Sequence, residues 1–396
     1  MERKQIEQLR ANNNIKSHET IAEHNKQLIL DALRFNGSMS RADLSRYLSM
    51  SFPAISSNAK GLLDANYITE IGVGDNTLGR KSTLLAFNAT RGYIIGVDFG
   101  RFRIRMMLAD LLGNEVMSTE IINTAGSPGN GEENIILIHD QVVDILEKSG
   151  KKKEDILCIV IGIPGIINEG MSYLAPFTEK YKEQDMIQTL QDTFEVDVIL
   201  ENCVNLGAIG EQWKGAGINY NDITYIAYGV GLGAAHIVDG KLYTGAKGAA
   251  GEIGFMVADP VNMSNTYDEI GSLEQTLSIS KIAHYLKGGN FDEEIVKLIK
   301  SYKAGDDMYA RVMLDEISLN FAIMLVNIVA ILNPEIIIIA GGLGYNLGKL
   351  FLENWKEALG KQLPFVPKLA LSELNHTETM LGAVNTGIKH VHKYLF

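Results

Sequence analysis

The chain has 396 residues, of which 46% are hydrophobic and 21% charged, and this length suffices for two or three domains with buried cores. The only two cysteines, Cys158 and Cys203, have no partner at metal-binding spacing, and neither a signal segment nor a membrane-spanning apolar run is expected. The composition excludes a secreted disulfide scaffold and an integral membrane protein, so we expect a cytoplasmic protein without a membrane partner.

The net charge of −12 is distributed unevenly along the chain. The first 88 residues contain 11 basic and 9 acidic side chains, whereas the remainder contains 25 basic and 39 acidic ones. Nucleic acids attract basic surfaces and repel acidic ones. The asymmetry therefore favours DNA binding for the N-terminal part only.

Three helices are predicted first. Apolar residues recur at helical spacing over residues 21–35. Ser40 is expected to cap a second, short helix over residues 41–48, and Ser51 a third one with Pro53 in its first turn. Two short helices joined by a three-residue turn are typical of a helix-turn-helix unit, although a serine-rich helix that only packs gives a similar pattern.

A predicted hairpin follows, with strands over residues 67–71 and 82–87 and a glycine-rich loop that carries Arg80 and Lys81. Three helices followed by such a hairpin describe a winged helix-turn-helix. Its second paired helix enters the major groove, while the wing reaches the DNA backbone or minor groove. The side chains expected at the DNA surface are Ser40, Arg41, Ser51, Phe52, Ala54, Ser56, Ser57, Lys60, Arg80 and Lys81.

From Gly92 onward, strands alternate with helices. The strand-like segments YIIGVDFG, RIRMMLAD and EVMSTEIIN precede helices expected over residues 132–148 and 185–194, and a helix over 308–332 leads into the apolar strand IIIIAGG. This alternation predicts two α/β lobes around a cleft, with their sheets covered on both faces. The expected domains are residues 1–88, 89–200 and 201–396, and it is left open whether the last helix returns to the first lobe.

The chain resembles a known family over nearly its whole length. The segments IGVDFG, IGIPG, ENCVN, GVGLG, GAAGEIG, GSLEQ and IIAGGLG occur in the order of the family named for repressors, open reading frames and kinases (ROK), and the N-terminal region resembles its repressor branch, similar to xylose repressors. The resemblance implies a winged helix-turn-helix fused to a two-lobed, actin-like sugar-kinase fold. It further implies a DNA-binding repressor of carbohydrate metabolism genes, a double-stranded DNA operator, and a homodimer or homotetramer.

Two motifs depart from those of the kinases in this family. Their phosphate turn reads Asp-x-Gly-Gly-Thr, whereas Arg101 and Phe102 follow Gly100 here, and bulky side chains keep backbone amides away from nucleotide phosphates. The kinases use the aspartate of Glu-Asn-Asp-Ala as base, whereas this chain has Cys203, whose thiol is protonated at neutral pH. We therefore expect no catalytic residue, no cofactor and no enzymatic activity. An active sugar kinase with an appended DNA-binding module is one alternative, and a regulator that senses no ligand is another.

The zinc element of the family is also altered. Family members surround zinc with one histidine and three cysteines, whereas Phe255 stands at the histidine position here. The cysteine positions hold Asn265, Tyr267 and Ser272. No metal is therefore expected.

The resemblance still implies a binding site for a sugar or sugar-phosphate effector. Asn202, Glu252 and Glu274 keep the hydrogen-bonding types that the family directs at sugar hydroxyls, although either glutamate alone could be a solvated surface acid. Gly231 is interpreted as a hairpin-turn residue only. The expected ligand-binding residues are Asn202, Cys203, Glu252, Phe255 and Glu274.

Overall fold

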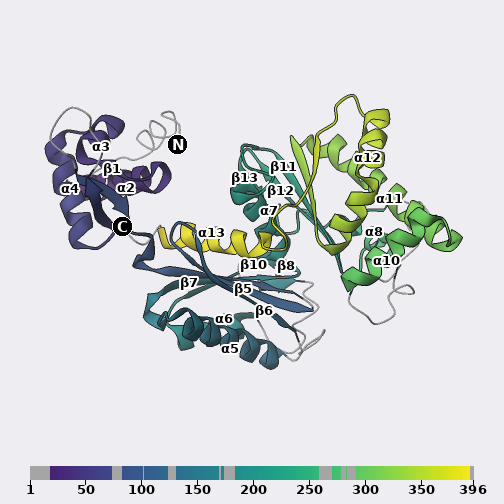
Figure 1. Ribbon diagram of the computed structural model, residues 1–396, viewed down its shortest axis with the longest axis horizontal. Coiled ribbons are helices and arrows are strands. Elements are labelled where there is room, and N and C mark those ends of the chain that lie inside the picture. Colours follow the sequence, from purple (N-terminus) through teal and green to yellow (C-terminus); the bar gives the residue numbers. More distant parts are fainter. Residues whose placement is uncertain are drawn as a thin grey trace.

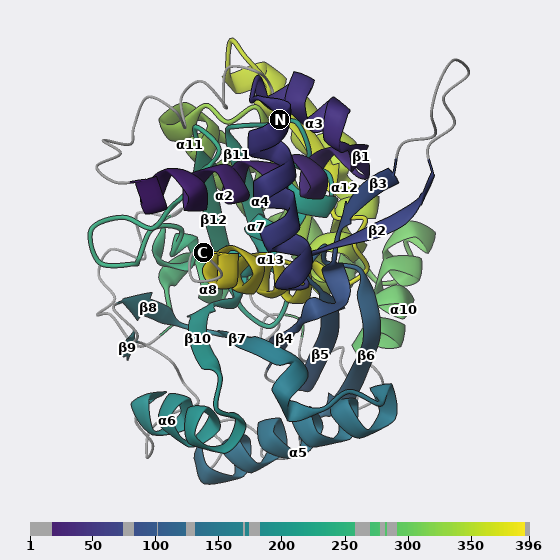
Figure 2. The ribbon, with the colours of Figure 1, turned by 90° about the vertical axis from the view of Figure 1, so that its left-hand side faces the viewer.

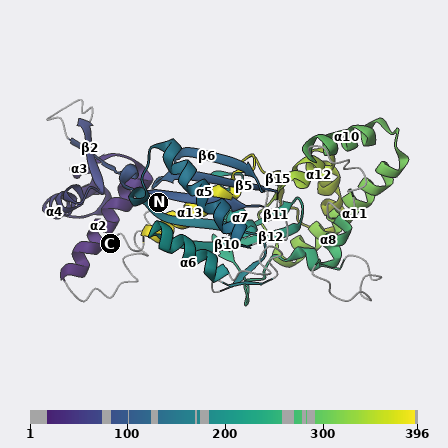
Figure 3. The ribbon, with the colours of Figure 1, turned by 90° about the horizontal axis from the view of Figure 1, so that it is seen from below.

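The computed structural model describes residues 18–73, 83–100, 102–123, 131–168, 171–173, 183–257, 270–277, 282 and 291–392. In these ranges, a small N-terminal unit is followed by two larger lobes along the long axis of the molecule (Figure 1 and Figure 3). This arrangement confirms the predicted fold class, a winged helix followed by a two-lobed α/β body.

The N-terminal unit combines three helices with a three-stranded sheet of order β1-β3-β2. The elements are α2 (His18–Asn36), β1 (Met39–Ser40), α3 (Arg41–Leu48), α4 (Phe52–Asp64), β2 (Ile68–Val73) and β3 (Thr83–Phe87). Leu44, Ile55 and Leu85 are fully buried in the core that these helices share with the sheet. Figure 2 shows α4 lying across α2, with β2 and β3 beside them.

The first lobe is built on a five-stranded sheet of order β10-β7-β4-β5-β6. Its strands are β4 (Tyr93–Phe99), β5 (Arg103–Asp110), β6 (Glu115–Ile122), β7 (Ile156–Ile163) and β10 (Asp197–Asn202), with a small hairpin of β8 (Ile166–Asn168) and β9 (Met171–Tyr173). Helices α5 (Gly131–Ser149) and α6 (Glu183–Phe194) cover one face, and the last helix, α13 (Glu378–His392), covers the other (Figure 1). Successive side chains of a strand point to opposite faces of the sheet, so β4 packs against helices on both sides. Ile95 packs toward α5 and α6, whereas Ile94 packs toward α13.

The second lobe contains a five-stranded sheet of order β13-β12-β11-β14-β15. Its strands are β11 (Ile223–Tyr228), β12 (Leu232–Val238), β13 (Lys241–Tyr243), β14 (Ile336–Ala340) and β15 (Lys368–Leu371). Helix α7 packs on one face, and α11 and α12 pack on the other. The helices of this lobe are α7 (Cys203–Lys214), α8 (Ser272–Leu277), α10 (Phe291–Ala304), α11 (Met308–Leu332) and α12 (Gly342–Gln362).

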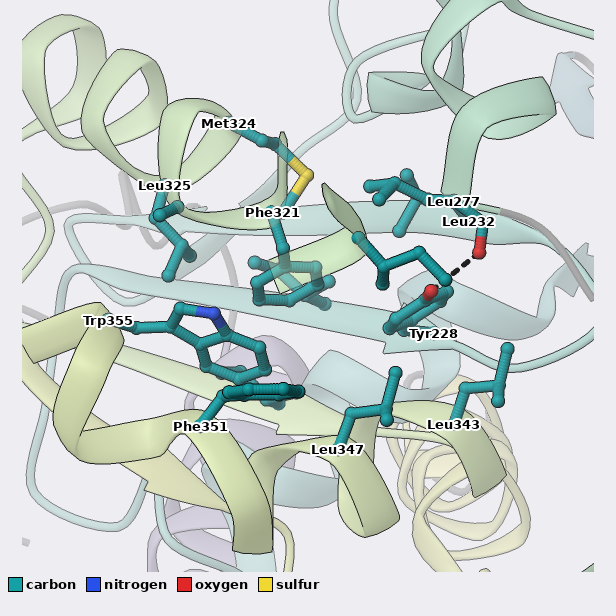
Figure 4. Packing of buried hydrophobic residues seen from close by; sticks show 14 of the residues in the cluster. Tyr228, Leu232, Leu277, Phe321, Met324, Leu325, Leu343, Leu347, Phe351 and Trp355 are labelled. Atoms are coloured by element: carbon teal, nitrogen blue, oxygen red, sulfur yellow. Dashed lines mark hydrogen bonds between the residues drawn. The ribbon is translucent and has the colours of Figure 1, made fainter. Parts of the chain in front are cut away.

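Stacked aromatic rings fill the core between the second sheet and its outer helices. Phe321 lies 5.4 Å from the Tyr228 ring and 4.3 Å from the Trp355 ring, measured between centroids. Figure 4 shows this row of rings, with Phe351 against Trp355 and a hydrogen bond from the Tyr228 hydroxyl to the Leu277 carbonyl. The Trp355 indole N–H donates to Ser318. The buried hydroxyl of Tyr228 and the buried N–H of Trp355 therefore both have hydrogen-bond partners.

Among the described residues, one helix, α11, is long and apolar enough to cross a membrane. Its inner side is part of the core described above. Phe321 and Leu325 on its inner side are fully buried in the second lobe. The core therefore accounts for the apolar side chains on the inner side of α11, whereas Leu319 and Ile331 are exposed.

The two lobes meet where α7 crosses α13. A Cβ atom at Gly210 would lie 2.0 Å from the Glu378 carbonyl oxygen, and one at Gly382 would lie 1.8 Å from the Leu206 carbonyl oxygen. Because α7 packs on the second sheet and α13 on the first, these glycines let the lobes join through direct backbone contact.

Three predicted helices begin earlier than expected. Helix α2 begins at His18 instead of residue 21, α5 at Gly131 instead of 132, and α6 at Glu183 instead of 185. The first residues of a helix make no intrahelical N–H bond, so apolar periodicity marks them poorly. The helix predicted over 308–332 has the observed bounds of α11. The domain boundaries stay predictions.

Candidate functional site

Most of the DNA contacts predicted from the sequence lie on α4 or at its N-cap. Ser51 caps this helix by accepting a hydrogen bond from the backbone N–H of Ala54 at 3.4 Å, and Phe52, Ser57 and Lys60 are exposed. Ala54 is half-buried, as is Ser56. We call the exposed residues Ser51, Phe52, Ser57 and Lys60 the recognition surface.

Besides Ser51, which caps α4, two more of the expected DNA contacts are engaged within the protein. Ser40 is 4% exposed, and its hydroxyl hydrogen-bonds the Asp43 carboxylate at 2.6 Å in a capping box that begins α3. The expectation for Ser40 is therefore corrected, because its side chain has a capping role below the surface. Arg41 forms a partly exposed ion pair with Glu70 of β2 at 3.0 Å. Arg80 and Lys81 lie outside the described residues.

We call the two lobes together the body. In the body, polar residues gather where the parallel strands of the first sheet end. In the register of the sheet, Asp98 of β4 and Glu201 of β10 flank Gly162 of β7 from either side. A Cβ atom at Gly162 would lie 2.9 Å from the Thr379 methyl group and 3.4 Å from the Cys203 Cα atom. The strand ends and the first turns of α7 and α13 therefore converge at the junction of the lobes, the usual place for a ligand in such sheets.

Asp98 is ion-paired with a residue of its own sheet. An Arg105 nitrogen lies 3.3 Å from the Asp98 carboxylate, and another lies 2.6 Å from Glu120. Burial raises the pKa of the Asp98 carboxyl, and the Arg105 charge opposes this rise. The Asp98–Arg105 pair was not predicted from the sequence, although counting back across the β4–β5 turn places Arg105 opposite Asp98.

Asn202 serves mainly as the cap of α7. Its side-chain oxygen accepts hydrogen bonds from the backbone N–H groups of Val204 at 2.7 Å and Asn205 at 3.1 Å, and its amide nitrogen donates to the Gly165 carbonyl at 2.7 Å. The oxygen thus uses both lone pairs within the protein. One N–H of the Asn202 amide is left for a ligand, so this residue chiefly positions the helix that carries Cys203.

Cys203 is the first residue of α7 and lies among acidic groups. Burial, with smaller effects from the charges of Asp98 and Glu252, raises the pKa of the Cys203 thiol to about 12. The Thr379 hydroxyl of α13 donates to the Cys203 carbonyl at 3.3 Å. The side chain is therefore a neutral thiol at physiological pH and is unable to accept a proton as a carboxylate base does.

Glu252 and Glu274 face the same region from the second lobe. Burial raises the pKa of both carboxyls, and the Glu252 charge raises that of Glu274 further, so the two groups are close. Cβ atoms at Gly231 and Gly254 would lie 3.0 and 2.9 Å from the two Glu274 oxygens. Gly231 thus lies close to the Glu274 carboxylate, and its interpretation as a turn residue stays a prediction. Both glutamates are half-buried, so neither is a freely solvated surface acid.

Phe255 ends a short 3-10 helix (Ile253–Phe255) that Glu252 precedes, and Ser272 begins α8. Asn265 and Tyr267 lie outside the described residues. Across the described ranges, no group of three or more histidine, cysteine, aspartate or glutamate side chains is arranged to hold a metal ion.

We call the N-terminal unit, from α2 to β3, the head. The head and the two-lobed body define the class of protein, which is a winged helix joined to an actin-like, sugar-kinase-type fold. A solved ROK family transcriptional regulator, described as a homologue of the E. coli MLC protein, has this fold with a TM-score of 0.73. It is 20% identical in sequence, and the match covers 94% of this chain and 96% of that one.

The chain belongs to the ROK family, which it matches over residues 94–387. It is 31% identical to the xylose repressor of Caldicellulosiruptor bescii over 393 residues, which cover 93% of this chain and 96% of the repressor. It is also 29% identical to the glucokinase of Halalkalibacterium halodurans over 274 residues, which cover 63% of this chain and 80% of the glucokinase. The family thus includes both regulators and enzymes among the relatives of this chain.

Proposed function

We propose that the chain is a DNA-binding transcriptional repressor of carbohydrate metabolism genes, with a body that binds a small sugar and does not transfer phosphate. One observation carries the proposal: a winged helix with an exposed recognition surface is joined to a body in which Cys203 is a neutral thiol, where the resemblance to the kinases of the family places their catalytic base. The likeness to a xylose repressor over nearly the whole of both chains supports it.

The head would bind duplex DNA through α4 in the major groove. Lys60 is exposed on α4, and Arg46 is exposed on α3, although Arg46 also pairs with Asp43. Lys60 and Arg46 are few cations for the outer side of α3 and α4. We therefore expect few contacts to DNA phosphates from these helices and a modest nonspecific affinity for DNA. Arg80 and Lys81 are proposed to add backbone contacts from the wing.

The body would bind its ligand between the lobes. The carboxyl oxygens of Glu252 and Glu274 can accept hydrogen bonds from sugar hydroxyls, and a carboxyl that is protonated can also donate one. Cys203 and Phe255 add less polar surface beside them. A ligand held by groups from both lobes favours the closed arrangement, and its differential affinity for that arrangement supplies the switch.

Helix α13 offers a route from this site to the head. Its first turn contacts the site through the Thr379 hydroxyl, which donates to Cys203. Its last turn contacts α2, because the His392 ring lies 3.0 Å from the Asp31 carboxylate and also contacts Gln27. Lobe closure that moves α13 would therefore move the head, and in a dimer it would change the spacing of the two recognition helices.

The proposed domains are residues 1–88, 89–200 and 201–396, with α13 contributed to the first lobe. We propose a cytoplasmic homodimer or homotetramer, since two-fold operators are read by two heads. Light scattering of the purified chain measures the number of subunits, and a monomer at micromolar concentration would contradict this part.

A gel-shift assay with fragments upstream of the protein's own gene tests the DNA function. We expect a retarded band at low salt that weakens as salt is raised. Replacement of Lys60 by Ala should reduce retardation of all fragments similarly, because a lysine at a phosphate carries no sequence information. If no fragment is retarded at low salt, the DNA-binding function is refuted.

The likeness to a glucokinase favours one second candidate, a sugar kinase with an appended DNA-binding head. A coupled assay for ADP release over hexoses and pentoses separates the two candidates. We expect no turnover above a protein-free control. Turnover that Cys203→Ala abolishes would establish the kinase instead.

A further inference from the structure

An aromatic side chain stands at the tip of the proposed recognition helix. Phe52 is the first residue of α4, and 53% of its surface is exposed. Pro53 beside it is also exposed, and Ala54 is half-buried. The first turn of α4 thus presents an apolar tip. In a helix-turn-helix, the N-terminal residues of the second helix are those that contact base edges.

The remaining side chains of this helix can distinguish bases only weakly. Arginine or lysine pairs with guanine, and asparagine or glutamine pairs with adenine, but the first turn of α4 contains none of these. Asn58 comes later, and its amide nitrogen donates to the Ala54 carbonyl at 2.8 Å. Lys60 comes two turns after Phe52. The serine hydroxyls hydrogen-bond any base, so they do not discriminate.

We propose that Phe52 selects thymine in the operator by packing its ring against the C5 methyl group. The methyl group is the apolar feature of the major-groove edges, so it is the one that an exposed phenyl ring matches. Contact removes part of the Phe52 ring and the methyl group from water, which favours binding. This inference rests on the proposed DNA-binding function and adds a specificity-determining residue to it.

The test removes single methyl groups from the DNA. The full-length protein first selects duplexes from a random library, and each thymine of the selected sequence is then replaced in turn by uracil, which lacks only the methyl group. At one thymine or one symmetric pair, uracil should weaken binding by about fourfold per methyl group. The variant Phe52→Ala should lose a similar factor on the thymine duplex and show no further loss on the uracil duplex.

Two further variants control the interpretation. Phe52→Leu keeps an apolar side chain and should retain part of the preference for thymine, whereas Asp64→Asn, at the exposed C-terminal end of α4 and outside the recognition surface, should keep all of it. Because Phe52 is largely exposed, these variants should melt at the temperature of the parent protein.

The outcomes are distinguishable. Failure to select any duplex at low salt refutes the DNA-binding function itself. Selection of a sequence whose uracil versions all bind equally well refutes the thymine contact alone. The thymine contact is also refuted if Phe52→Ala keeps the full preference for thymine. It is refuted as well if Phe52→Ala weakens binding but the parent protein binds thymine and uracil duplexes equally.

Discussion

At the scale of single residues, the environment of Glu378 changes the chemistry of its carboxyl group. It is the first residue of α13, it is buried, and one of its carboxyl oxygens has no hydrogen-bond partner within the described ranges. Burial raises the pKa of Glu378 to about 7. A hydrogen bond from its own backbone N–H, at the start of the helix, acts in the opposite direction and lowers the pKa. The charges of Asp98 and Glu211 raise this pKa further, and Arg105 lowers it.

A raised pKa makes the contribution of Glu378 to stability depend on pH in a defined direction. Below the ordinary pKa of 4.5, the carboxyl is protonated in both the folded and the unfolded chain, and the folded state pays no penalty. As pH rises toward 7, the unfolded chain releases the proton first, so stability falls. Glu378→Gln should therefore raise the free energy of unfolding by up to about 3 kcal/mol at pH 8 and change it little at pH 4.5.

Urea unfolding of the parent and the variant at both pH values measures this difference. Glu353→Gln, on the exposed side of α12, is the matched control and should have little effect at either pH, because its exposed ion pair with Lys356 contributes little. An equal effect of Glu378→Gln at both pH values would show that the change acts through packing.

Part of the residue-level site was predictable from sequence, and part was not. Cys203, Glu252 and Glu274 stand in recognisable motifs, and capping rules assign Asn202 to the start of a helix. Glu378 has no such signal, because it reaches Asp98 only after the last helix has returned to the first sheet. Contacts between residues so far apart in the chain carry no local pattern that a single sequence reveals.

At the scale of elements, the crossing of α7 and α13 holds the lobes together. A Cβ atom at Gly382 would come within 1.8 Å of the Leu206 carbonyl oxygen, so the helices must separate to admit one. Gly382→Ala should therefore lower the free energy of unfolding by about 3 kcal/mol.

Gly360 in α12 is the control, because a Cβ atom there meets nothing nearer than 4.0 Å. Gly360→Ala should stabilise the protein by up to about 1 kcal/mol, since alanine favours helix. Thermal melts of the two variants compare them directly. A tolerated Gly382→Ala would contradict the close backbone contact.

Helix α13 also leads to a prediction about signalling. His392 contacts Asp31 of the head, whereas His390 in the same last turn lies 2.7 Å from Asp197 of the first lobe. His392→Ala should leave DNA affinity without effector within about twofold, because a partly exposed contact contributes little, and should reduce the change in affinity on adding effector.

Titration of fluorescent operator DNA with and without effector measures both quantities. His390→Ala is the matched control and should keep the full response, because its contact lies inside the first lobe. Equal responses of both variants would show that the His392 contact does not couple the head to the body.

At the scale of the whole molecule, the order of elements was predictable and their meeting points were not. Periodicity and glycine turns identified the winged helix and both sheets, because each repeats a local pattern. The convergence of Asp98, Cys203 and Glu252 at the lobe junction follows from the packing of α7 between the two sheets. Only the three-dimensional arrangement brings these groups together.

The most direct test of the central claim is a selection of genomic DNA. The full-length protein is mixed with fragments of its own genome at physiological salt, and the retained fragments are sequenced with and without a panel of sugars. We predict retention of a few fragments upstream of carbohydrate metabolism genes, and their release by one sugar. Retention of no specific fragment, or retention that no sugar changes, would contradict a sugar-responsive DNA-binding regulator.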